Sequence, residues 1–168
     1  GARAHGRLSE ILEVGAEGFI HHLTGRGRRR CSRFDDGMTP LHGTIGRARG
    51  LVLVSPVHNY NVTAWMKAFI DRLYCFYDFE YPRPGPWRSR LSGQGRRALV
   101  VAVAEQRDLS DAGFTLEAML RPLEALSYEV MDDLLVLGTF GRGAVSRMDA
   151  VLSTAEAAGR DLVGAIAL

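Results

Sequence analysis

Residues 51–57 read LVLVSPV, and this short run decides the class of fold. The run is apolar on both faces, is rich in β-branched residues and is stopped by Pro56. Two similar runs follow it, ALVVAVA at residues 98–104 and DLLVL at residues 133–137. Because each run is too short for a helix and apolar on both faces, each predicts a parallel strand covered by helices.

Amphipathic helical patterns alternate with these runs, at residues 8–23, 38–48, 63–76, 112–126 and 146–167. In the first pattern one stripe collects Leu8, Ile11, Leu12, Gly15, Phe19 and His22. We expect the last helix to face inward with Met148, Val151, Leu152, Ala155, Leu162 and Val163. Alternating helices and strands predict an α/β fold with a parallel sheet, and residues 1–168 are expected to form a single domain.

The composition excludes several classes of protein. The chain has 168 residues with 46% hydrophobic and 24% charged residues, which is too apolar for a disordered chain. Two cysteines, Cys31 and Cys75, exclude a disulfide scaffold and favour a reducing, cytoplasmic location. The net charge of +2 and the shortness of the apolar runs argue against nucleic-acid and membrane partners.

The loop that follows the first run is the candidate binding site. Residues 55–63 read SPVHNYNVT and lead into a helical pattern, with Asn61 or Thr63 as its cap. Open α/β sheets bind ligands at the carboxyl ends of their strands. Amide side chains and backbone N–H groups at such an edge suit the rim of a flat heteroaromatic ring with carbonyl and imino groups. An ordinary strand–turn–helix connection is the alternative.

The longer stretch SPVHNYNVTAWMKAFIDR, at residues 55–72, resembles the NADPH-dependent FMN reductases and their relatives, the iron–sulfur flavoproteins. The matching positions are Ser55, Pro56, Asn61, Val62, Thr63, Lys67, Phe69, Ile70, Asp71 and Arg72. Weaker similarities lie at DDGM (35–38), LSYEV (126–130) and GRDL (159–162). The resemblance implies a flavodoxin-like three-layer sandwich with strand order 2-1-3-4-5. Strands 1 and 2 of that order are missing from the printed chain, so we expect segments omitted before Gly1 and between about Phe19 and Cys31.

The resemblance also implies FMN as cofactor and proposes the residues that hold it. The N-terminus is similar to the family's phosphate loop, which assigns this role to Gly1, Arg3, Arg7 and Ser9, while Leu8 stands where a hydroxyl is usual. The ring edge is assigned to Ser55, Pro56, Val57, His58, Asn59, Tyr60, Asn61 and Val62. Glu105 and Gln106 reach the ring edge or form a polar loop tip. His58 stacks on or hydrogen-bonds the flavin, or it only packs in place of the usual Tyr.

The implied chemistry belongs to the cofactor, with hydride passing from NAD(P)H to FMN and electrons passing on to a quinone, flavin or other small acceptor. We therefore expect no catalytic side chain. We also expect no metal, because two thiols cannot hold an iron–sulfur cluster. A homodimer or homotetramer is implied. The alternatives are a flavodoxin-like electron carrier and an interaction module without FMN.

Two irregular stretches complete the chain. Residues 77–95 are rich in proline, aromatic residues and arginine, which predicts a lid or an interface with Trp87 as the lid residue. Residues 25–30 read GRGRRR and predict a solvated loop or a phosphate contact. Trp65, Tyr74, Phe76 and Tyr77 are expected in the core or on a dimer surface, and Asp71 and Arg72 are expected to be structural.

Overall fold

A computed structural model describes residues 36–82 and 84–167 of the chain. Helices and strands alternate through this part, with short 3₁₀ turns labelled η between them. The elements are α1 (Met38–Arg47), β1 (Gly50–Pro56), α2 (Ala64–Arg72), η2 (Leu73–Phe76), β2 (Tyr77–Phe79), β3 (Trp87–Ser89), β4 (Arg96–Val103), η3 (Leu109–Ala112), α3 (Thr115–Ala125), β5 (Tyr128–Val136), η4 (Val145–Arg147) and α4 (Asp149–Ala167).

The sheet is parallel, as the apolar runs predicted. Its described strands lie in the order β1-β4-β5, which matches the last three positions of the predicted flavodoxin-like order. The third strand was predicted too short, because β5 begins at Tyr128 rather than at residue 133. The residues missed include Glu129 and Asp132, which are exposed on an edge strand and therefore carry no apolar signal.

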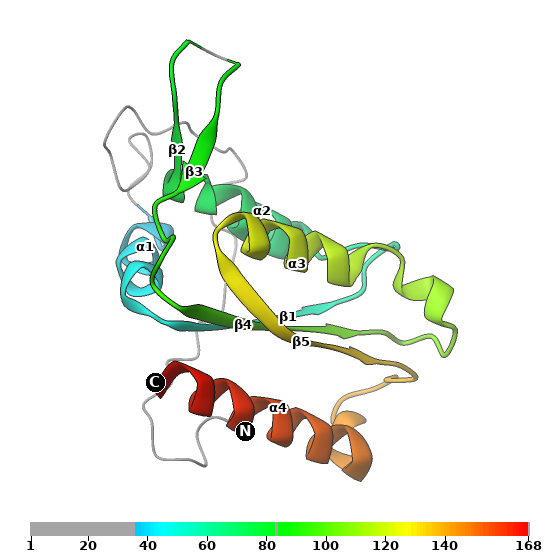
Figure 1. Ribbon diagram of the computed structural model, residues 1–168. Helices are drawn as coiled ribbons and strands as arrows, with labels where there is room; N and C mark the ends of the chain where they lie inside the picture. Colours follow the sequence, from blue (N-terminus) through cyan, green and yellow to red (C-terminus); the bar gives the residue numbers. More distant parts are fainter. Residues whose placement is uncertain (1–35, 83, 168) are drawn as a thin grey trace.

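The helices form two layers around the sheet (Figure 1), with α2 and α3 over one face and α4 over the other. The larger core lies on the first side. It joins residues of α1, α2 and α3 to the strand residues Leu53, Val100 and Tyr128. The smaller core lies under α4, where Leu99 packs against Ala158 and Leu162.

The last helix packs less closely than its sequence pattern suggested. Leu162 is buried as predicted, at 3% exposure. Leu152 is 43% exposed and Ala155 is exposed too, so their predicted inward orientation is wrong.

Two predicted helices have different bounds in the structure. The helix predicted over residues 63–76 ends at Arg72 and continues as the 3₁₀ turn η2, while Thr63 caps its start by accepting the Met66 N–H at 3.1 Å. The helix predicted over residues 112–126 begins only at Thr115, because Gly113 interrupts the backbone with φ +53°.

Residues 77–95 contain a small antiparallel hairpin, β2–β3, rather than an irregular loop. Tyr77 contacts Trp87 edge-on at 4.9 Å between ring centroids, and Tyr74 stacks on Phe79 at 5.2 Å. The hairpin projects from the end of the sheet where the strands begin (Figure 1), so Trp87 does not cover the carboxyl edge of its own chain, contrary to the lid prediction.

Several expectations fall outside the described residues. These are the helix over residues 8–23, the omitted segments, the basic run 25–30, Cys31, and the phosphate-loop residues Gly1, Arg3, Arg7 and Ser9. Within the part that the structure describes, no helix has the length and apolar character that crossing a membrane requires.

Candidate functional site

The loop after β1 forms a tight turn at the carboxyl edge of the sheet. Val57 is tied to the neighbouring strand, because its N–H donates to the Val103 carbonyl at 2.8 Å. His58 and Asn61 then exchange two backbone hydrogen bonds, of 2.8 and 3.1 Å. Between them, Asn59 has φ +50° and Tyr60 has φ +64°. Two successive positive φ values inside a closed four-residue turn define type I′ geometry.

This turn is conformationally costly for its sequence. Type I′ turns favour glycine and asparagine, and a bulky residue such as Tyr60 adopts the left-handed region only when its surroundings impose it. Each such residue costs about 1–3 kcal/mol, and residues of this kind cluster at ligand sites. The strain at Tyr60 is therefore an observation that points to function.

The turn presents hydrogen-bond donors to the solvent. Among the described residues, the N–H groups of Asn59 and Tyr60 have no protein acceptor. Both residues are exposed, and Tyr60 is 56% exposed. Two adjacent N–H groups at this edge can bind acceptor atoms on the rim of a ligand.

Polar side chains inside the loop shape it. Ser55 is fully buried, and its hydroxyl donates to the Pro56 carbonyl at 2.9 Å and accepts the Thr63 N–H at 3.3 Å. The Asn61 side-chain oxygen accepts the Val62 N–H at 2.8 Å. Two of the residues predicted to hold the cofactor thus use their side chains to set the backbone.

His58 begins the turn and is exposed. Its contact with the flavin and its packing in place of Tyr both stay predictions. His58 directly precedes Asn59 and Tyr60 in the sequence. Its backbone hydrogen bonds with Asn61 close the turn.

A second loop, which the sequence analysis missed, holds the turn from the other side. The Phe114 N–H donates to the Tyr60 carbonyl at 2.8 Å. At Gly113, a Cβ atom would lie 2.2 Å from that same carbonyl oxygen. Only glycine fits this approach, and the motif DAGF directly before a helix was the signal that could have revealed it.

The loops after β4 and β5 extend the same edge. The Gly138 N–H donates to the Gln106 carbonyl at 2.9 Å, and Thr139 donates to Ala104 through both its N–H (3.0 Å) and its hydroxyl (2.9 Å). Glu105 and Gln106 are exposed at this edge, as a ligand contact or a polar loop tip would require. Hydrogen bonds therefore connect the carboxyl ends of the three described strands along one edge of the sheet.

An ion pair joins Asp36, which lies just before α1, to Arg72 at the end of α2. The Arg72 guanidinium is 1% exposed and donates to both carboxylate oxygens of Asp36, at 2.7 and 2.8 Å. This hydrogen bonding lowers the pKa of Asp36. The buried His42 donates to the Arg72 carbonyl at 3.0 Å, and burial lowers its pKa. Arg72 is thus structural, as predicted, while Asp71 pairs with Lys67 on the surface.

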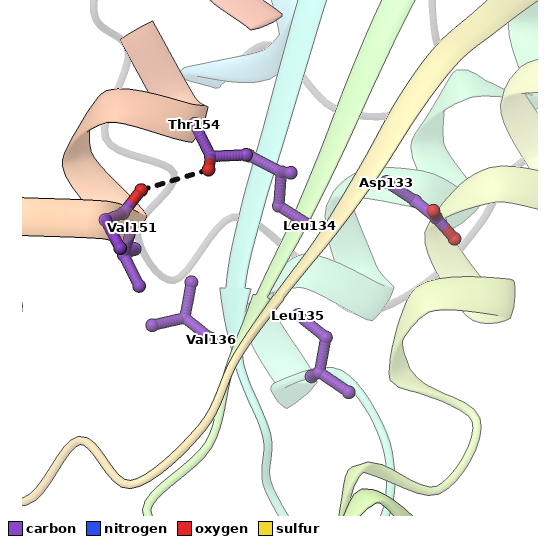
Figure 2. Close-up of a pocket in the computed structure, with 7 residues that line it drawn as sticks. Asp133, Leu134, Leu135, Val136, Val151 and Thr154 are labelled. Carbon is purple, nitrogen blue, oxygen red and sulfur yellow. Dashed lines mark hydrogen bonds between the residues drawn. The ribbon is translucent and has the colours of Figure 1, made fainter. Parts of the chain in front are cut away.

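A separate cleft of about 240 Å³ lies between β5 and α4. Figure 2 shows Leu134, Val136 and Val151 turned toward it, while Asp133 points to the other side of the strand. The Thr154 hydroxyl donates to the Ala150 carbonyl of its own helix at 3.0 Å. The side chains turned toward the cleft are mostly apolar, so the cleft reflects loose packing of α4. In the described residues, no three His, Cys, Asp or Glu side chains gather to hold a metal ion.

These features define a class of protein, an open parallel α/β sheet of flavodoxin-like type, with a candidate ligand-binding loop at its carboxyl edge. The model of one family, described as NADPH-dependent FMN reductase, matches residues 3–128. The chain belongs to the NADPH-dependent FMN reductase family.

Solved structures show the same fold at low sequence identity. One is an FMN-dependent NADH-azoreductase from Bacillus anthracis in complex with FMN, with a TM-score of 0.56, 21% identity and 74% of this chain covered. Another is a proposed quinone reductase from Klebsiella pneumoniae, with a TM-score of 0.52, 20% identity and 71% of this chain covered. The chain spans 61% and 53% of the lengths of these two proteins. No curated protein matches it.

Proposed function

We propose that this protein is an FMN-dependent NAD(P)H oxidoreductase that reduces a small-molecule acceptor. The proposal rests on family membership and on one observation, the strained turn at residues 58–61 with the open N–H groups of Asn59 and Tyr60. A flavin ring carries carbonyl and imino groups along one edge, and the carbonyl oxygens accept hydrogen bonds from such donors.

The residues of this chain bind and orient the cofactor. The N–H groups of Asn59 and Tyr60 hold the ring edge, and exposed His58, Glu105 and Gln106 border it. Gly1, Arg3, Arg7 and Ser9 are proposed to hold the phosphate, because loop N–H groups before a helix favour anions and arginine adds charge. When bound, FMN supplies hydride and electron transfer between NAD(P)H and the acceptor.

The proposal also includes the chemical class of the electron acceptor. A quinone, a free flavin or another small electron acceptor fits a reductase that uses no catalytic side chain. We further propose a cytoplasmic homodimer or homotetramer built from single-domain chains. An electron carrier without its own substrate is the competing function, although carriers of the flavodoxin type are usually acidic and this chain has a net charge of +2.

The junction between Gly113 and Tyr60 provides the sharpest test. We expect Gly113→Ala to weaken FMN binding at least tenfold, because the new Cβ atom collides with the Tyr60 carbonyl and displaces the turn. Gly93→Ala is the matched control, since Gly93 also has a positive φ (+72°) but no atom lies within 4 Å of a Cβ placed there. Flavin fluorescence quenching measures the affinity of both variants.

Different outcomes distinguish the proposed reductase from its alternatives. NADPH oxidation with a quinone, without any partner protein, supports the reductase, whereas FMN binding without such turnover supports the carrier. Equal FMN affinity of the two glycine variants would remove the turn from the site. Absence of FMN binding by the unmodified chain would support the interaction module.

A further inference from the structure

The β5–α4 connection, residues 137–148, is a basic segment at the carboxyl edge that the proposed function leaves unused. It reads LGTFGRGAVSRM and follows the carboxyl end of β5 (Figure 1). Gly138, Gly141 and Gly143 have positive φ values of 71°, 85° and 75°. The connection contains two arginines and no acidic residue. Open α/β sheets bind their ligands at this edge, and the charge of the connection favours an anion.

The backbone of the β5–α4 connection keeps several donors free. Among the described residues, the N–H groups of residues 140–143 have no acceptor. The sign of φ alternates over this stretch, because Gly141 and Gly143 are positive while Phe140 and Arg142 are not. Successive N–H groups in a backbone of this kind form a concave group of donors that binds anions.

A third arginine comes from the loop after β4. The Gly138 N–H donates to the Gln106 carbonyl at 2.9 Å, so Arg107 lies where the two loops meet. The Cγ and Nε atoms of Arg107 are 3.5 and 3.8 Å from the position of a Cβ atom built on Gly138. The Arg107 side chain therefore lies against the connection that carries Arg142 and Arg147.

The three arginines are not neutralised within the described part of the chain. Arg107, Arg142 and Arg147 are exposed and take part in none of its ion pairs, although six other described arginines do. The neighbouring Asp108 carboxylate is engaged in its own turn, where it accepts the N–H and the hydroxyl of Ser110. Unpaired guanidinium groups beside open N–H groups suit a phosphate monoester, which carries about −1.5 to −2 charges at pH 7 and three acceptor oxygens.

We propose that the β5–α4 connection and Arg107 bind the 2′-phosphoadenosine end of NADPH, an inference that rests on the proposed function. Arg107 and Arg142 hold the 2′-phosphate, so the site selects NADPH over NADH. Phe140 is 78% exposed, and exposed aromatic rings stack on nucleic bases, so Phe140 takes the adenine.

The position of the connection agrees with this assignment. β5 is two strands away from β1 in the sheet, a distance of about 10 Å. Dinucleotides bind along the carboxyl edge of open α/β sheets. A dinucleotide that delivers hydride at the turn of residues 58–61 therefore reaches the β5–α4 connection along the same edge.

Calorimetric titration of the oxidised, FMN-loaded protein with NADP⁺ and with NAD⁺ tests the proposal, because the two ligands differ only in the 2′-phosphate. We expect NADP⁺ to bind at least tenfold more tightly. Arg107→Gln and Arg142→Gln should each weaken NADP⁺ binding about tenfold and leave NAD⁺ binding unchanged, since each removes a charge-assisted hydrogen bond. Arg47→Gln is the matched control, because Arg47 is also exposed and outside the ion pairs but lies at the end of α1, before β1 begins.

Two further variants test the base and the backbone separately. Phe140→Ser should weaken NADP⁺ and NAD⁺ binding by the same factor, because both ligands carry adenine. Gly141→Ala should weaken NADP⁺ binding more than NAD⁺ binding, because an alanine strains the φ of +85° and displaces the open N–H groups. Gly93→Ala is its control, since Gly93 has a φ of +72° and neither glycine has an atom within 4 Å of an added Cβ.

Equal affinity of the unmodified protein for NADP⁺ and NAD⁺ would overturn the proposal. An equal loss of both ligands in the arginine variants would also overturn it, because the connection would then hold the diphosphate that the two coenzymes share. FMN affinity, measured by fluorescence quenching in parallel, keeps this inference apart from the proposed function. Unselective coenzyme binding with FMN binding intact removes only the inference, whereas absence of FMN binding removes the proposed function itself.

Discussion

Both faces of the sheet carry apolar side chains, but the two faces differ in how far those side chains are buried. On the face toward α2 and α3, Leu53, Val100 and Tyr128 are 4%, 0% and 3% exposed. On the face toward α4, Leu99 is 4% exposed but Val52 and Val54 are 45% and 54% exposed. Strands that are apolar on both faces require cover on both faces, and burial then depends on which helix lies above each residue.

The largest expected effect comes from removing matched leucines on the two faces. Leu123 of α3 is 0% exposed and Leu152 of α4 is 43% exposed. We expect Leu123→Ala to lower the free energy of unfolding by about 2–5 kcal/mol, because it leaves a cavity in the closely packed core. Leu152→Ala should cost about 0.5 kcal/mol or less, as exposed substitutions usually do. Urea unfolding measures both, and similar losses would mean that α4 is covered as closely as α3.

The sequence predicted this architecture well where apolar patterning determined it. β1 and β4 follow from LVLVSPV and ALVVAVA, and Thr63 caps α2 as expected. The first half of β5 could not be predicted from apolar patterning, because Glu129 and Asp132 are exposed on an edge strand.

The candidate site was predicted less completely. The loop at residues 55–63 was located by its position after an apolar run. The left-handed conformation of Tyr60 within that loop was not predicted. That conformation depends on contact with Gly113 and Phe114, more than 50 residues away in the sequence. Local propensity opposes it, so only tertiary structure could reveal it.

The ion pair between Asp36 and Arg72 gives the next effect and belongs to the better-covered side of the sheet, because α1 and α2 both contribute to the larger core. Removing one partner of a buried pair costs about 3–5 kcal/mol. The Asp36 side chain is 27% exposed, so we expect Asp36→Asn to cost less, about 1–3 kcal/mol.

The pH dependence of this ion pair has a definite sign. The pKa of Asp36 is lowered in the folded state, chiefly by hydrogen bonding to Arg72. Its contribution is therefore complete above the unfolded pKa of 3.8 and is lost as the pH falls through the lowered value. Urea midpoints measured between pH 7 and pH 2 should fall for the unmodified chain, and less steeply for Asp36→Asn. Parallel profiles would show that the carboxylate is not stabilised by Arg72.

The smallest expected effect concerns His42, which lies in the same covered layer. The residue is 4% exposed, its Nε2 donates to the Arg72 carbonyl, and its Nδ1 has no hydrogen-bond partner in the described part of the chain. Burial lowers its pKa below 6.5, and the Arg72 charge acts in the same direction, while hydrogen bonding to the Arg72 carbonyl and the Asp36 charge oppose the shift. The folded protein therefore holds a neutral imidazole at pH values where the unfolded chain already binds a proton.

Protonation of His42 therefore favours the unfolded chain, and stability should fall as the pH drops below 6.5 toward the lowered pKa. His42→Gln keeps a side-chain donor for the Arg72 carbonyl and removes the titration, so its stability between pH 7 and pH 5 should change less than that of the unmodified chain. If the profile of His42→Gln ran parallel to that of the unmodified chain, the buried imidazole would not be the titrating group.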